Sequence, residues 1–181
     1  MRLLFSSLVI LMLCAPLGCT QRDGKSEPKS TGTSGMLPAY SLEEVTHYQY
    51  EAGKLKIKVM FEKGDFFEEL QELRVEKCRF VYYDSNGNSV SRGHSNKAVL
   101  YEGSSLLVAE DDVVVISEEN GGMLKTDYLE WRGDSSQFVT DSFVTITREN
   151  GDTLQGIGMI TDLALNYVTV KRNVRGSMEA E

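Results

Sequence analysis

Cysteine is scarce in this chain of 181 residues, which has only three. Cys14 and Cys19 lie in or just after an apolar N-terminal segment, which leaves Cys78 as the single thiol of the remainder. If the first two belong to an export signal, no disulfide can form within the folded part. Cys78 lies in the strand-like run Val75–Tyr83, so we expect it to be a small buried apolar side chain rather than a reactive thiol.

Histidine is equally rare, and neither His47 nor His94 has the neighbours of a catalytic triad or a metal site. Asp111 and Asp112 are adjacent carboxylates, but neighbours on a strand point to opposite faces and form no acid–base pair unless a bulge rotates one. The stretch 84–88 resembles the start of a calcium loop, but Ser89 stands where that loop needs glycine and Ser95 where it needs glutamate, so a plain hairpin turn is expected. The sequence therefore predicts no enzyme, no metal and no cofactor.

An excess of basic residues is also missing, since 27 acidic residues outnumber 19 basic ones and give a formal net charge of −8. This balance argues against binding of nucleic acid or of an anionic membrane through bulk charge. An anionic partner would have to be held by apolar contacts or by a local cluster.

No apolar run is long enough for a membrane span. Leu3–Leu17 has about 15 residues, whereas a span needs roughly 20. The charged start, short apolar centre and small residue at the end are typical of a secretory signal. Gly18-Cys19 resembles the lipobox of bacterial lipoproteins, in which the cysteine is lipidated. We therefore predict a signal peptide over residues 1–18 and lipidation of Cys19, with an uncleaved short anchor as the alternative.

Residues 19–38 have too few large apolar side chains to fold and are expected to be a flexible tether. Such a coil has a root-mean-square span of about 25 Å. The folded domain is then residues 39–181. On either interpretation of the N-terminus, the chain leaves the cytoplasm and stays attached to a membrane.

A repeat of roughly 30 residues organises residues 104–176, a period that indicates repeated supersecondary units. Val113, Val144 and Val174 hold the same place in its three copies. Asn120-Gly121 and Asn150-Gly151 lie between the copies and favour type I′ hairpin turns. The repeat is therefore interpreted as a β-hairpin.

Turn signals elsewhere predict antiparallel strands of about 10–12 residues, which is long for a globular protein. Asp65–Leu73 is ambiguous and is expected to be an irregular connection or one helical turn. Gly156 and Gly158 indicate a bulge or the close approach of another backbone. Alternation of side chains predicts one apolar inner face, formed by Phe80, Tyr82, Val113, Val115, Leu124, Leu129, Trp131, Val144, Ile146, Leu154, Met159, Val168, Val170 and Val174.

Four segments together resemble a known family. Leu124–Trp131, Phe138–Ile146, Gly151–Met159 and Asn173–Gly176 are similar, in this order and spacing, to segments of the periplasmic lipopolysaccharide-export component LptC. A weaker likeness reaches back to about Ser41. The resemblance implies an all-β fold, a twisted β-jellyroll of long antiparallel strands and hairpin repeats that is open along one side.

The resemblance also implies a function. Its members hold the acyl chains of lipopolysaccharide (lipid A) in an apolar groove, which would here be the inner face above. They receive the lipid from the subunits of an inner-membrane ABC transporter and pass it to an LptA-like bridge protein by edge-strand addition. Gly156 and Gly158 match the family's glycine-rich strand. A lipobox-like signal replaces the usual spanning helix, so the expected location is the periplasm, anchored to the inner membrane through Cys19.

A second hypothesis is a structural surface lipoprotein that presents loops on a closed β-repeat domain. The two differ in one respect, because a lipid carrier needs a slot between its apolar faces whereas a loop-presenting scaffold is closed and dry.

Overall fold

The computed structural model of the protein describes residues 36–178. The predicted signal peptide, Cys19 and most of the predicted tether lie outside these residues, and the predicted domain boundaries remain a prediction. The described part is built of strands, as expected for an all-β chain. They are β1 (Tyr40–Glu51), β2 (Lys54–Phe67), β3 (Glu72–Tyr83), β4 (Ser89–Tyr101), β5 (Leu106–Ser117), β6 (Met123–Arg132), β7 (Gln137–Thr147), β8 (Thr153–Asp162) and β9 (Val168–Ser177).

The strands form one nine-stranded sheet in which each strand pairs with its neighbours in the sequence, in the order β1 to β9. Every pairing is antiparallel. The predicted meander of long strands is thus confirmed. Within residues 36–178 we find no helix of the length and apolar character that crossing a bilayer requires.

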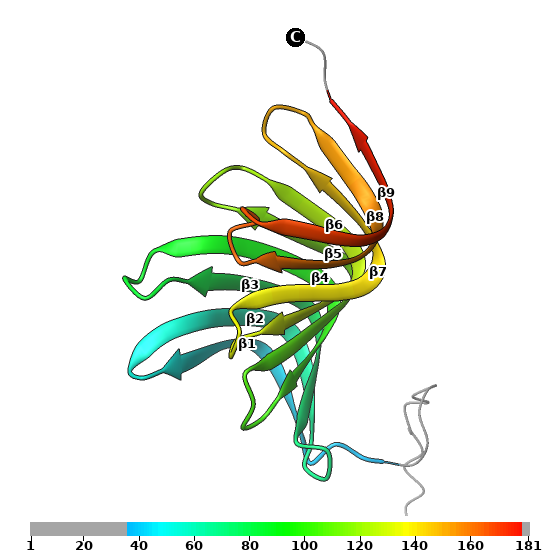
Figure 1. The fold of residues 1–181 in the computed structure, drawn as a ribbon. Coiled ribbons are helices and arrows are strands. Elements are labelled where there is room, and N and C mark those ends of the chain that lie inside the picture. The colour runs from blue at the N-terminus through cyan, green and yellow to red at the C-terminus, as the bar shows by residue number, and fades with distance from the viewer. Residues whose placement is uncertain (1–35, 179–181) are drawn as a thin grey trace, which may run out of the picture. The chain divides into compact units, whose positions relative to one another are not determined.

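Each strand is bent near its middle, as Figure 1 shows. The ladder of β5 with β6 shifts register between Glu110 and Val113, and that of β7 with β8 shifts between Thr140 and Phe143. Asp111 and Asp112 occupy the left-handed region, with φ of 66° and 55°. An extra residue in one strand of a pair bends that strand, and because the interruptions lie at a similar level in successive strands, the sheet folds over on itself.

The fold produces two layers. Layer A comprises the strand halves that lead to the turns at 52–53, 84–88, 118–122 and 148–152. Layer B comprises the halves that lead to the turns at 68–71, 102–105, 133–136 and 163–167. Phe80 of layer A lies 6.4 Å from Phe138 of layer B, and Tyr82 lies 6.1 Å from Trp131, measured between ring centroids. The inner faces of the two layers therefore pack against each other.

The packed inner faces form the hydrophobic core. Val59, Val115, Leu124, Val144 and Met159 are each 0% exposed. Burial of such a side chain is worth about 1.5–3 kcal/mol relative to its exposed state. The core extends through most strands of the sheet and is the main source of stability for this architecture.

Two local predictions were wrong. Gly121 and Gly151 have φ of 66° and 87°, but Asn120 and Asn150 do not have positive φ, so the turns are not type I′. Each asparagine instead accepts a hydrogen bond through its side-chain oxygen, from the N–H of Gly122 at 2.9 Å and of Asp152 at 3.1 Å. The longer turn needs only one residue of positive φ, which glycine supplies.

The segment 65–73 is neither irregular nor helical over its length. β2 continues to Phe67 and β3 begins at Glu72, with a turn over 68–71 closed by the N–H of Leu70 donating to the carbonyl of Phe67 at 3.2 Å. Phe66 and Leu73 are a cross-strand pair of β2 and β3, and Leu70 lies exposed in the turn between them, so their spacing does not reflect a helix.

The glycines of β8 have the predicted roles. A Cβ on Gly156 would lie 2.7 Å from the carbonyl oxygen of Arg172, so the neighbouring backbone approaches closely there. Gly158 has a φ of 74°, and the register of β8 with β9 shifts between Gln155 and Ile157. Both the bulge and the close approach are confirmed.

Candidate functional site

Most of the predicted inner-face residues lie together in the core. The fully buried members are Phe80, Tyr82, Val113, Val115, Leu124, Leu129, Trp131, Val144, Ile146 and Met159. Leu154, Val168 and Val170 are partly buried and pack against them. Their placement on one face is as predicted, but the side chains contact one another, and their role as lipid contacts stays a prediction.

Val174 differs from the rest of this set. Leu154 pairs with Gly176, so alternation puts Val174 on the inner face as well. Its side chain is nevertheless 54% exposed, because β9 is the last strand of the sheet that the structure describes. Val174 therefore belongs to the C-terminal end of the inner face and not to the core.

A cavity of about 500 Å³ lies between the layers at the β1 end. Leu42 and Leu100 of layer B and Val45 and Val59 of layer A contribute apolar walls. His47 and residues of the 102–105 turn lie among the lining residues as polar groups. The full lining is Tyr40, Leu42, Val45, His47, Gln49, Val59, Phe61, Phe66, Leu73, Leu100, Tyr101, Glu102, Gly103, Ser104, Ser105, Leu106 and Leu107.

None of the predicted groove residues lines this cavity. The cavity arises because β1 is an edge strand, so the inner side chains of Leu42 and Val45 have no further strand beside them and remain half-buried. Glu44 has a φ of 51° and bends β1 at this point. Alternation of apolar and polar side chains in the sequence does not reveal where the inner face is left unfilled.

Away from β1, the turns of the two layers are joined by a clasp, which we define as Asn120 with residues 163–167. The side-chain nitrogen of Asn120, Nδ2, donates to the carbonyl of Ala164 at 3.0 Å and to the side-chain oxygen of Asn166 at 2.7 Å. Asn166 in turn donates to Glu119 at 3.2 Å. Since Asn120 lies on a layer A turn and Ala164 on a layer B turn, the clasp joins the two layers.

The apolar part of the clasp reinforces it. Leu163, Ala164 and Leu165 are 5%, 5% and 3% exposed and belong to the core. The inner face is therefore covered near β5–β9 and hollow near β1.

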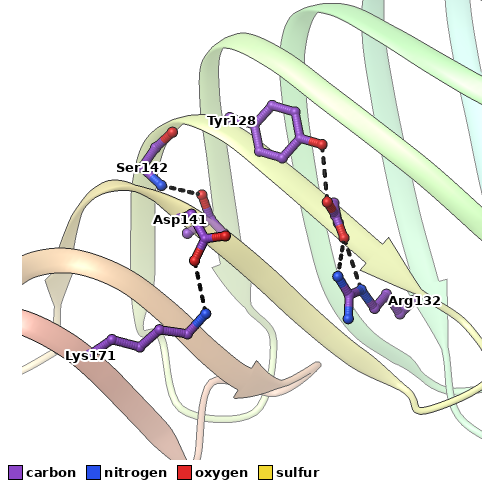
Figure 2. A network of polar contacts seen from close by, with 7 residues as sticks. Tyr128, Arg132, Asp141, Ser142 and Lys171 are labelled. Carbon is purple, nitrogen blue, oxygen red and sulfur yellow. Dashed lines mark hydrogen bonds and ion pairs between the residues drawn. The ribbon is translucent and has the colours of Figure 1, made fainter.

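A network of polar side chains lies on the outer face of layer B (Figure 2). The hydroxyl of Tyr128 donates to Glu130 at 3.0 Å, and Arg132 donates to the same carboxylate through Nε at 2.8 Å and Nη2 at 2.5 Å. Partial burial, and then the adjacent Glu130 carboxylate, raise the pKa of Tyr128 to about 12. The hydroxyl therefore stays protonated at neutral pH and keeps donating this hydrogen bond.

Figure 2 also shows how β9 is tied to the sheet. The ammonium of Lys171 on β9 lies 2.9 Å from the carboxylate of Asp141 on β7, and this ion pair lowers the pKa of Asp141. The N–H of Ser142 donates to the hydroxyl of Thr140 at 3.0 Å within the bulge of β7. Both contacts are near the bend, where the ladder is interrupted.

Other reactive groups have ordinary roles. Cys78 is buried, and burial raises the pKa of its thiol to about 12. Asp84 accepts hydrogen bonds from the N–H groups of Asn86 and Asn88, as expected for a hairpin turn. Asp111 and Asp112 lie in a bulge, but both are exposed. In the part of the chain that the structure covers, no three His, Cys, Asp or Glu side chains gather as metal ligands.

Comparison with known proteins finds a matching family and matching solved structures. The family described as lipopolysaccharide-assembly, LptC-related, matches residues 7–179. The crystal structure of LptH, described as the LptA homologous periplasmic component of the conserved lipopolysaccharide transport device from Pseudomonas aeruginosa, superposes with a TM-score of 0.55 at 8% sequence identity, covering 68% of this chain and 95% of that one. At this identity the match shows the fold alone, a β-jellyroll as predicted. No curated protein sequence matches.

Proposed function

Because the chain belongs to the LptC family of lipopolysaccharide-assembly proteins, we propose that it is a periplasmic lipopolysaccharide transport component that holds its lipid by the acyl chains. The family resemblance seen in the sequence is confirmed by this match. The family is one of transport proteins, so a carrier and not an enzyme is the function to be explained.

The cavity at the β1 end is the observation that carries the proposal. Its volume of about 500 Å³ lies within the range of roughly 300–1,000 Å³ typical of ligand pockets. Its walls are largely aliphatic and aromatic, which suits acyl chains. Each buried methylene is worth about 0.8 kcal/mol, so partial enclosure of a chain gives substantial affinity. Phosphates are not required for this grip, in keeping with a net charge of −8.

The two ends of the sheet then have different roles in the proposal. Lipopolysaccharide enters at the β1 end from the inner-membrane ABC transporter and leaves at the β9 end toward an LptA-like bridge protein. Within the sheet of residues 36–178, β1 and β9 each have one unpaired edge, and an exposed edge accepts a strand from a partner. Val174 extends the inner face to the β9 end, where a partner's inner face would continue it. Passage between the ends requires the layers to separate along their open side.

Membrane attachment through lipidated Cys19 is part of the same proposal. The tether predicted over residues 19–38 would let the jellyroll stand away from the bilayer by about 25 Å.

The alternative of a closed scaffold has one observation in its favour, which is the filled core from β3 to β8 together with the clasp. It leaves the cavity at the β1 end without a purpose. Absence of lipid from that cavity in the cell would favour the scaffold.

Photo-crosslinking in living cells tests the proposal. A photo-reactive amino acid at Leu100, which lines the cavity, should form adducts with lipopolysaccharide. The matched control is Val99, because the adjacent residue of β4 points to the opposite face of the sheet. The predicted inner-face positions Val144 and Ile146 test whether lipid also enters the packed region. Absence of adducts at Leu100 and at a second cavity position, Leu42, would contradict the proposal.

A further inference from the structure

The outer face of layer A carries a set of basic side chains that the transport function does not use. Lys58, Arg79, Arg92 and Lys125 lie on β2, β3, β4 and β6. The register aligns them in two adjacent rows across the sheet, since Lys58 pairs with Val81 and Val81 with Arg92, while Met60 pairs with Arg79. We call these four residues, with the apolar residues between them, the basic face. The apolar members are Met60, Val81, Val114, Ile116 and Met123.

The two rows contain no acidic residue from β1 to β9. The first row reads Thr46, Met60, Arg79, His94, Val114, Lys125, Thr145, Gln155 and Arg175, and the second reads Tyr48, Lys58, Val81, Arg92, Ile116, Met123, Thr147, Thr153 and Ser177. The outer face of layer B differs, because Glu43, Lys63, Glu76, Lys97 and Glu110 alternate in charge across β1–β5. These two rows thus hold a local excess of positive charge in a chain of net charge −8.

Most of these cations have no acidic partner within the described part of the chain. Arg92 pairs with Glu118 of the adjacent turn. Lys58 lies 5.9 Å from the centroid of the Tyr48 ring, a cation–π contact that leaves its charge in place. Arg79 and Lys125 make no ion pair with residues 36–178 and are exposed. Their charges remain available to a partner.

The floor between the cations is apolar and slightly hollowed. A depression of about 230 Å³ is lined by Met60, Val81, Val114 and Ile116 together with the stems of Arg79 and Arg92. Gly93 lies beneath this floor, where a Cβ would come within 2.4 Å of Phe80. Basic side chains over a half-buried apolar floor suit a partner with anionic groups and some apolar surface.

The size of the face identifies the kind of partner. Neighbouring strands are about 4.8 Å apart, so the cations from β2 to β6 extend over roughly 19 Å. A single phosphate group is too small to contact all of them. A bilayer with anionic phospholipids presents negative charge repeatedly over such a distance, with apolar surface beneath the headgroups.

We propose that the basic face docks the jellyroll against the anionic phospholipid headgroups of a bilayer. It gives the domain a defined orientation on the membrane that a flexible tether alone would not provide. Each lysine or arginine near such a surface contributes about five-fold in binding, so the attraction is moderate and reversible. The proposal rests on charge placement and not on lipid carriage, so either one can fail without the other.

Lysine footprinting on vesicles tests it with the full chain. The protein is reconstituted on vesicles of phosphatidylcholine alone or of equal parts phosphatidylcholine and phosphatidylglycerol, and the acetylation rate of each lysine is read by mass spectrometry. We expect Lys58 and Lys125 to be protected at least five-fold on the anionic vesicles only. Lys63 and Lys97, on the outer face of layer B, serve as internal controls whose rates stay unchanged. Protection should disappear at about 0.5 M salt, where charges are screened beyond roughly 4 Å.

A matched pair of double variants sharpens the test. Arg79→Gln/Lys125→Gln removes two charges from the basic face and should weaken docking about 25-fold, which abolishes the protection of Lys58. Lys63→Gln/Lys97→Gln removes the same charge from the other face and should leave that protection intact. All four residues are exposed, so both variants should unfold at the wild-type temperature.

Three results would overturn the proposal. Lys58 and Lys125 could be unprotected on both kinds of vesicle, which would mean that the face is not docked. Equal protection on neutral vesicles would indicate crowding by the tether. Protection that follows protein concentration, and not the anionic lipid, would assign the face to a second copy of the chain.

Discussion

The inner face of the jellyroll is solid near its middle and hollow near β1, although the same alternation of apolar side chains builds both regions. Leu124 has a paired strand on each side and a facing layer above it, and its exposed fraction is 0%. Leu100 packs against the same core but lines the cavity and stays partly exposed. Leu100 also has a paired strand on each side, at Leu73 and Leu107, so an apolar inner residue is fully buried only where the facing layer covers it as well.

The largest effect should separate these two leucines. Leu124→Ala leaves a void in the packed region and is expected to lower the free energy of unfolding by about 2–5 kcal/mol. Leu100→Ala removes the same atoms beside an existing cavity and should cost less than about 1.5 kcal/mol, because part of its surface is already uncovered. Urea denaturation measures both. Equal losses would mean that the cavity is as tightly packed as the core.

Gly93 gives a second test of close packing in the middle. A Cβ there would lie 2.4 Å from Cζ of Phe80 and 2.6 Å from the carbonyl oxygen of Val114. Gly93→Ala should therefore destabilise the domain by about 1–3 kcal/mol through overpacking. Gly176→Ala in β9 is the matched control, because its nearest contact is an ordinary 3.7 Å to the carbonyl of Thr153. Similar denaturation midpoints for the two variants would contradict this difference.

The clasp should contribute a smaller amount. Asn120→Ala removes the two hydrogen bonds donated to Ala164 and Asn166 and the one accepted from the N–H of Gly122. We expect a loss of about 1–2 kcal/mol. Amide hydrogen exchange should also quicken in residues 163–167 and not in the turn at 68–71. Unchanged exchange in 163–167 would show that the buried Leu163–Leu165 holds the layers together without Asn120.

The smallest effect is a pH dependence on the outer face. The pKa of Tyr128 is raised to about 12 in the folded protein, above the usual value near 10. A raised tyrosine pKa stabilises the fold below pH 10, and this contribution is lost as the pH rises from about 10 to 12. Tyr128→Phe should flatten the fall in thermal stability over this window. An identical pH profile in the variant would contradict the assignment.

Much of the fold could be predicted from alternation alone. Period two placed Leu124, Val144 and Met159 on one face, because a strand has no other way to bury them. The bulges could not be predicted in the same way, because Asp111 and Asp112 adopt positive φ without glycine. Only the glycines of β8 indicated a bulge in the sequence.

The cavity was beyond the reach of sequence patterns. Leu42 and Val45 have the same local pattern as core residues, and their partial exposure follows from the edge position of β1 and its bend at Glu44. The clasp was missed for a related reason. The sequence around Asn120 indicates only its own turn, whereas its partners Ala164 and Asn166 are more than forty residues away.

The mid-strand interruptions of the ladder make the width of the domain independent of its extent across the strands. The bend recurs at a similar level from strand to strand. Strand length therefore fixes the width of the two layers, and the number of hairpins fixes how far the layers extend across the strands. An inserted hairpin would extend the layers by two strand spacings, about 9.6 Å, without altering their width. The architecture can thus be extended stepwise, within one chain or by joining chains end to end, at constant cross-section.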